Sequence, residues 1–194
     1  LLGGDEEVNK KLDEFFSRSS ELGDEASMDI TGLIGQYAHG NEPSHHTTYM
    51  YAYSGEHYKI ADKVRYINNE LYTDQPDGLS GNEDCGQMSA WYILSSMGFY
   101  PVNPSNGAYV FGSPLFDEVV LDIPGQKQFK ISAKNNSDKN IYIQSVSLNG
   151  EDHKYSYITH KEILKGGELE FTMGPKPNKD FGKEKKYRPE SIVY

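Results

Sequence analysis

Several features that are common in proteins are scarce in this sequence of 194 residues. Cys85 is the only cysteine, which excludes an internal disulfide bond and a metal site built from several thiolates. Basic residues number 19 against 29 acidic ones, so the net charge is −10 at pH 7. Such a charge repels polyanions and argues against a nucleic-acid-binding protein. No apolar run approaches the roughly 18 residues of a membrane helix, so no membrane-spanning segment is expected.

Familiar catalytic and targeting motifs are also missing. The sequence has neither of the common phosphate-binding patterns GxxxxGK[ST] and GxGxxG, nor the serine hydrolase motif GxSxG. It begins at Leu1 without an initiator methionine, a basic segment or a long apolar segment, so no signal peptide is predicted. We therefore expect a processed or truncated piece of a protein.

Three segments carry apolar residues at helical spacing, and they lie at residues 5–17, 57–67 and 87–97. Gly98 follows the third segment as a stop signal, and Pro101 prevents its continuation. The pattern predicts amphipathic helices joined by long polar loops, and such loops often carry functional sites.

After residue 104 the pattern changes to short runs of strand-forming residues separated by turn signals. The predicted strands are 109–111, 118–123, 128–133, 141–148 and 168–172. The chain is therefore predicted to be α+β. A helical part over residues 1–104 is followed by a small antiparallel β-sandwich over 105–175 and an irregular tail over 176–194. The basic cluster Lys183–Arg188 in that tail is expected to be solvated.

The first polar loop, residues 39–46, reads His-Gly-Asn-Glu-Pro-Ser-His-His. Asn41 and Glu42 place an amide oxygen next to a carboxylate, and such hard oxygen ligands suit Ca²⁺. Three histidines also suggest a transition metal, but adjacent rings are poorly placed to bind one ion. The alternative is that Asn41 or Ser44 caps a helix that starts near His45, with Glu42 simply solvated.

The second polar loop, residues 78–87, places Asn82, Glu83 and Asp84 directly before the third helix. A carboxylate held in a cleft can act as a base toward water. The alternative is that Asp84 caps the helix, where its charge is favoured. The spacing differs from that of an EF-hand loop, which is excluded.

Longer motifs around both loops resemble the C-terminal part of glycoside hydrolase family 92. They are GNEPSHH at residues 40–46, GNEDCGQMSAWY at 81–92 and GFYPVNP at 98–104, extended by GSPLF at 112–116. The resemblance covers about residues 1–175. It implies the last helices of an (α/α)₆ toroid followed by a short β region. It also implies a calcium-dependent exo-α-mannosidase that inverts the anomeric centre.

The resemblance also implies catalytic roles. It makes Asp84 the general base that activates water, and Asn82 stands where some members carry a second aspartate that assists. The family's general acid is a glutamate that precedes a segment similar to residues 1–4. We therefore expect the acid to lie upstream, and this chain alone to be inactive.

The remaining implied roles concern binding. Asn41 and Glu42 would contribute to the calcium site, and three histidines would bind sugar hydroxyls. These histidines are His39, His45 and His46. The expected partners are a mannose-containing oligosaccharide and the upstream remainder of the same protein.

The expected function is α-1,2-mannosidase activity in glycan degradation, including N-glycans, by a secreted or periplasmic bacterial protein. Two alternatives stay open. One is a non-catalytic carbohydrate-binding or scaffold module, which would need an aromatic platform but no base beside a metal. The other is a structural remnant that folds but neither binds nor catalyses.

Overall fold

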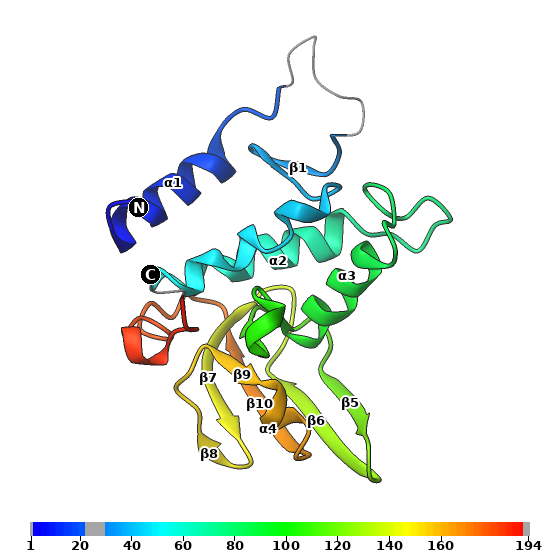
Figure 1. The fold of residues 1–194 in the computed structure, drawn as a ribbon, viewed down its shortest axis with the longest axis vertical. Helices are drawn as coiled ribbons and strands as arrows, with labels where there is room; N and C mark the ends of the chain where they lie inside the picture. Colours follow the sequence, from blue (N-terminus) through cyan, green and yellow to red (C-terminus); the bar gives the residue numbers. More distant parts are fainter. Residues whose placement is uncertain (1, 22–29, 192–194) are drawn as a thin grey trace.

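The computed structural model describes residues 2–21 and 30–191 and has mixed α+β architecture. The α-helices are α1 (Asp5–Ser17), α2 (Lys59–Glu70), α3 (Gln87–Met97) and the short α4 (His160–Ile163). Figure 1 shows the three long helices in the upper part of the view and the largest sheet at its lower end. The predicted helices at 5–17 and 87–97 are confirmed at both ends, whereas α2 begins two residues after its predicted start and continues to residue 70.

Local signals explain where α3 begins and ends. Gly86 before it and Gly98 after it have φ angles of 90° and 103°, in the left-handed region that glycine adopts at little cost. The Gly98 N–H closes the helix by donating to the carbonyl oxygens of Leu94 and Ser95.

Within the described residues, ten strands form three sheets. Their bounds are β1 (Leu33–Ile34), β2 (Tyr37–Ala38), β3 (Phe99–Tyr100), β4 (Ala108–Phe111), β5 (Glu118–Ile123), β6 (Lys127–Lys134), β7 (Tyr142–Leu148), β8 (Glu151–Asp152), β9 (Tyr157–Thr159) and β10 (Gly167–Gly174). The five predicted strands are β4, β5, β6, β7 and β10. The others are two or three residues long, too short for a periodic pattern to reveal.

The largest sheet has the strand order β5-β6-β10-β7-β8, and a second sheet has the order β3-β4-β9. The prediction of a purely antiparallel β region is wrong, because β6 and β10 pair in parallel from Phe129 opposite Gly167 to Lys134 opposite Thr172. The chain between them passes through β7, β8, β9 and α4 before it re-enters the sheet in the same direction as β6. That long connection is what a parallel pair requires.

One hydrophobic cluster joins the five-stranded and three-stranded sheets. Phe111 from β4 packs edge-to-face on Phe171 from β10, with ring centroids 5.1 Å apart. Ile131 and Leu169 are also buried in this cluster. A second cluster lies among the helices around Trp91 of α3, which is fully buried as the helical pattern predicts.

Short elements connect the helices and form the site. The β1–β2 hairpin leads to the 3₁₀ helices η1 (Glu42–Ser44) and η2 (Thr47–Ala52). Two further 3₁₀ helices are η3 (Pro104–Asn106) and η4 (Lys185–Tyr187). No helix within the described ranges combines the length and hydrophobicity that crossing a membrane demands.

Candidate functional site

The two polar loops predicted from the sequence meet through their backbones. A Cβ atom added to Gly81 would lie 2.7 Å from the Cα atom of Gly40, which is closer than real Cβ contacts permit. Beside this contact, the Thr31 hydroxyl donates to the Ser80 carbonyl oxygen. Glycine at position 81 is therefore required by the close approach of the two loops.

This approach brings Glu42 and Asp84 together. The Glu42 carboxyl lies within hydrogen-bonding reach of Asp84, and this hydrogen bond, followed by the Glu42 charge, raises the pKa of Asp84 above its ordinary value. The side chain of Asp84 is exposed and that of Glu42 is half-buried. Two carboxyl groups 42 residues apart in sequence thus face each other at the surface.

Asp84 lies on an unusual turn. Asp84, Cys85 and Gly86 have φ angles of 45°, 59° and 90°, so three successive residues are in the left-handed region. The following helix is capped by another residue, because the Glu83 carboxylate accepts hydrogen bonds from the Ser89 N–H at 3.1 Å and from its hydroxyl at 2.8 Å. The Asp84 carboxyl makes no such bond to the helix and points to Glu42 on the first loop instead.

The helix-capping alternative for the first loop also finds no support. Asn41 precedes η1 but its side chain makes no capping hydrogen bond. The Ser44 hydroxyl donates to the carbonyl oxygens of Ala38 at 2.6 Å and Asn41 at 2.7 Å, whereas a capping side chain accepts a hydrogen bond from a backbone N–H. The Asn41 and Asn82 side chains are both exposed, one on each loop.

His39 lies inside the protein. The Tyr72 hydroxyl donates to the Met88 carbonyl oxygen at 3.0 Å, so it accepts from His39 Nε2–H at 2.7 Å. The Tyr37 hydroxyl, 2.8 Å away, therefore donates to His39 Nδ1. Burial, followed by the nearby His45, lowers the pKa of His39 to about 3, and the ring is neutral.

His45 is buried and stacks on the His39 ring, with centroids 4.6 Å apart. Its Nε2–H donates to the His39 carbonyl oxygen at 2.8 Å, and its Nδ1 accepts from the Gln87 amide at 3.0 Å. Burial lowers the pKa of His45, although the bond to the His39 carbonyl opposes the shift. Both rings thus contact the loop from the protein interior, whereas the His46 side chain is exposed. Direct sugar contact by the two buried rings stays a prediction that requires them to move.

Sequence reasoning missed the side chains that orient these histidines. Tyr37 and Tyr72 flank His39, and the Gln87 amide spans from His45 to the Tyr100 hydroxyl at 3.0 Å. Gln87 stands inside the GNEDCGQ motif, which was a usable signal. Tyr72 lies in a separate segment without any motif, so nothing in the sequence singles it out.

The donor set suits calcium only in part. In the described part of the chain, no group of three or more His, Cys, Asp or Glu side chains is arranged to hold a metal ion. The Glu42–Asp84 pair supplies two carboxylates, and Asn41 adds an exposed amide oxygen nearby in sequence. Calcium takes six to eight oxygen ligands, so further oxygens are needed from backbone, water or another part of the protein.

Known proteins resemble this chain over most of its length. The model of the glycosyl hydrolase family 92 catalytic domain matches residues 1–175. A family 92 α-mannosidase from Bacteroides thetaiotaomicron is 40% identical with a TM-score of 0.89, and the match covers 98% of this chain and 25% of that one. A structure of that enzyme with mannoimidazole gives 42% identity and a TM-score of 0.91, covering 97% and 25%.

Two further relatives are similar to this chain. A family 92 inverting mannosidase from the same bacterium is 37% identical with a TM-score of 0.84, covering 98% of this chain and 27% of that one. An uncharacterized secreted glycosidase from Arthroderma benhamiae is 33% identical over 138 residues, which are 70% of this chain and 18% of that protein. The chain therefore spans about a quarter of the length of the solved relatives.

Proposed function

This chain belongs to glycosyl hydrolase family 92, and from that membership we propose that it is the C-terminal portion of a calcium-dependent exo-α-mannosidase. The enzyme inverts the anomeric centre and prefers α-1,2-linked mannose. Its helices α1–α3 are part of an (α/α)₆ domain. The observation that carries the proposal is the contact between Glu42 and Asp84, on two loops that meet at Gly40 and Gly81.

Asp84 is the general base in this proposal. It is exposed to water, and its turn directs the carboxyl away from the helix N-terminus that Glu83 occupies. An ionised carboxylate that water can reach is able to accept a proton from that water, which is the step a general base performs. Asn82, two residues before it and also exposed, would assist by orienting the water or the sugar.

Glu42 cannot be the acid partner of Asp84 in an inverting reaction. Inverting enzymes keep their two carboxyl groups about 6.5–9.5 Å apart, with a water between the base and the sugar. Carboxyl groups within hydrogen-bonding reach leave no such space. In this proposal the general acid comes from a part of the protein outside these 194 residues, and we expect this chain alone not to hydrolyse mannosides.

Glu42 and Asn41 have a metal-binding role in the proposal. Two facing carboxylates repel each other when both are ionised, and a divalent cation relieves that repulsion. When bound, the calcium ion would coordinate mannose hydroxyls and favour distortion of the ring. Within this chain, Glu42 supplies charge, Asn41 supplies a neutral oxygen and Asp84 stays free to take a proton.

His46 is the histidine best placed to bind a sugar hydroxyl, because its side chain is exposed next to the buried His45. His39 and His45 help to position His46 indirectly, because the hydrogen bond from His45 Nε2–H to the His39 carbonyl oxygen fixes the loop. The similarity to a secreted glycosidase supports an extracellular location. A bacterial source, with a periplasmic location as the alternative, and glycan substrates are further parts of the proposal.

The test joins this chain to its upstream region and measures release of mannose from α-1,2-mannobiose. We expect activity that EDTA removes and calcium restores, with β-mannose as the first product seen by NMR. Asp84→Asn should lower kcat about 10²–10⁴-fold without unfolding the protein. Asp77→Asn, which removes another exposed carboxylate from the same loop region, is the matched control. An Asp84→Asn enzyme with normal kcat, or α-mannose as the first product, would refute the assignment.

The alternative of a non-catalytic carbohydrate-binding module has less support. A stacking platform needs exposed aromatic rings, and the aromatic side chains beneath the two loops are buried, including Tyr37 and Trp91. Binding of mannose by this chain in the presence of EDTA would favour the module instead.

A further inference from the structure

The segment after the family match, residues 176–191, is attached to both halves of the molecule. On the β side, Asn178 donates to the Gln144 carbonyl oxygen at 2.8 Å, and the Gln144 amide donates to the Lys176 carbonyl oxygen at 2.9 Å. The buried Ser156 donates its N–H to the Tyr187 carbonyl oxygen at 2.9 Å. The tail was expected to be irregular, and these bonds fix the course that it takes.

On the helical side, the same segment covers His57. The Phe181 ring meets the His57 ring edge-on, with centroids 5.0 Å apart. Gly182 passes so close that an added Cβ atom would lie 3.2 Å from the His57 Cβ atom and 3.0 Å from that of Ser156. The segment thus bridges the junction between the helices and the sheets.

Arg188 is the strongest of these attachments, and the expectation of a solvated side chain is wrong for it. Its side chain is 11% exposed and Nη1 donates to the Asp5 carboxylate at 2.7 Å and to the Tyr53 carbonyl oxygen at 3.2 Å. Nε donates to the Lys183 carbonyl oxygen at 3.0 Å. Gly55 leaves the space for the guanidinium, since a Cβ atom there would collide with it. One side chain thus connects the first turn of α1, the residue that follows η2 and the tail.

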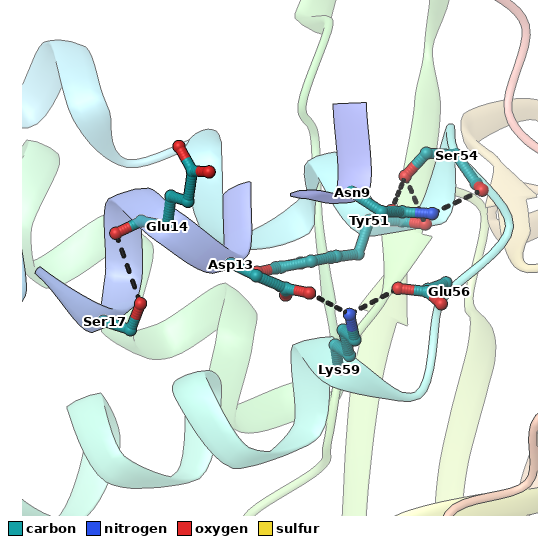
Figure 2. Close-up of polar contacts among 8 residues, drawn as sticks. All are labelled: Asn9, Asp13, Glu14, Ser17, Tyr51, Ser54, Glu56 and Lys59. Carbon is teal, nitrogen blue, oxygen red and sulfur yellow. Dashed lines mark hydrogen bonds and ion pairs between the residues drawn. The ribbon is translucent and has the colours of Figure 1, made fainter. Parts of the chain in front are cut away.

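The middle of α1 is attached differently. Figure 2 shows Asn9 bonded to Ser54, and Lys59 between Asp13 and Glu56, at 2.5 Å from each carboxylate. These contacts fix α1 near its second and third turns, whereas Asp5 in the first turn is bonded to the tail.

The far end of the tail lines a cavity beside the candidate site. This cavity, of about 820 Å³, lies between α1, η2 and the tail, and His46 is part of its wall. Glu190 and Ser191, which follow Arg188 and Pro189, also line the cavity, and Met50 and Val102 supply apolar surface. The position of the tail therefore determines the shape of a cavity that contains the exposed histidine of the site loop.

We propose that residues 176–191 are a strap that, through Arg188, clamps the start of α1 onto the end of η2 and sets the wall of the cavity around His46. The proposal rests on contacts within this chain and stands independently of the mannosidase assignment.

Amide hydrogen exchange of the 194-residue chain tests the strap. Arg188→Ala should accelerate exchange at least tenfold in α1 and in η2, while β10 keeps its protection. Lys185→Ala, which removes an exposed positive charge from the 3₁₀ helix directly before Arg188, is the matched control and should leave all three elements unchanged. Faster exchange in the tail alone would overturn the proposal, because α1 would then be fixed without the strap. Equal acceleration in every element would also overturn it, since Arg188 would then act on global stability only.

A second variant separates the two ends of the clamp and serves if Arg188→Ala fails to fold. Asp5→Asn weakens only the bond to α1, so α1 should exchange faster while the bonds of the tail to Ser156 and Gln144 keep residues 176–187 protected. Unchanged exchange in α1 of Asp5→Asn would contradict the clamp.

Discussion

Acidification should destabilise the protein through His57, a buried histidine that the proposed chemistry does not use. Its side chain is 3% exposed and its Nε2–H donates to the Phe111 carbonyl oxygen at 2.9 Å. Burial, partly opposed by this hydrogen bond, lowers the pKa of His57 from 6.5 to about 4. The unfolded chain therefore takes up a proton near pH 6.5, whereas the folded protein resists protonation until about pH 4.

The direction and size of the effect follow from linkage. Stability due to the neutral His57 is fully present above pH 6.5 and is lost as the pH falls toward 4. The gap between the two pKa values, about 2.5, corresponds to about 3 kcal/mol of unfolding free energy. That is a large part of the roughly 5–15 kcal/mol that stabilises a typical domain.

The assay is urea unfolding followed by the fluorescence of Trp91, the only tryptophan and a fully buried one. His57→Gln keeps an N–H donor for Phe111 but does not titrate. We expect the unfolding free energy of the wild type minus that of His57→Gln to fall by about 3 kcal/mol between neutral pH and pH 4. Other histidines are common to both proteins and cancel in this difference. His160→Gln, at an exposed position, is the control. A difference that stays constant with pH would refute the reasoning.

Three other predictions concern the site and the junction. Gly81→Ala should separate the two loops, because the new Cβ atom meets the Gly40 backbone, and should cost about 1–3 kcal/mol in urea unfolding while lowering activity of the longer enzyme. Glu42→Gln should lower the pKa of Asp84, because Glu42 is the cause of its rise, and it should also weaken calcium binding. NMR of the carboxyl groups measures the first effect and calorimetry the second. An unchanged pKa of Asp84 would contradict the pairing of the two carboxyl groups. Arg65→Met should destabilise the chain by roughly 2–4 kcal/mol, because its buried guanidinium bonds Ser113 and the Pro114 carbonyl; a loss below about 0.5 kcal/mol would refute that role.

The sequence predicts best those elements whose signals are local. The helix at 87–97 is found at both ends because Gly98 supplies the left-handed stop directly after the apolar pattern. The strand at 118–123 is found at both ends because turn signals enclose it. The sequence does not predict which strands pair. Nothing in the runs at 128–133 and 168–172 reveals that these two distant segments align in parallel.

The same distinction holds for the site. The two loops were identified because they concentrate polar residues and glycines, and the close approach at Gly40 and Gly81 explains why glycine is needed there. The burial of His39 was not foreseen, because it depends on Tyr72, which lies 33 positions away. The role of Arg188 was missed for the same reason: its partner Asp5 is 183 positions away, and a lone arginine among lysines carries no signal of burial.

The central position of β10 has a consequence for how the protein emerges from the ribosome. β10 is the last strand in the part of the chain that the structure describes, yet it lies between β6 and β7 and brings Leu169, Phe171 and Met173 into the core. Until this strand has been synthesised, β6 and β7 each have an unpaired inner edge, so the sheet assembles late. Contacts so distant in sequence also form slowly. We expect nascent chains that end before β10 to expose their strands to chaperones and aggregation, and chains that end just after it to be the shortest that complete the sheet.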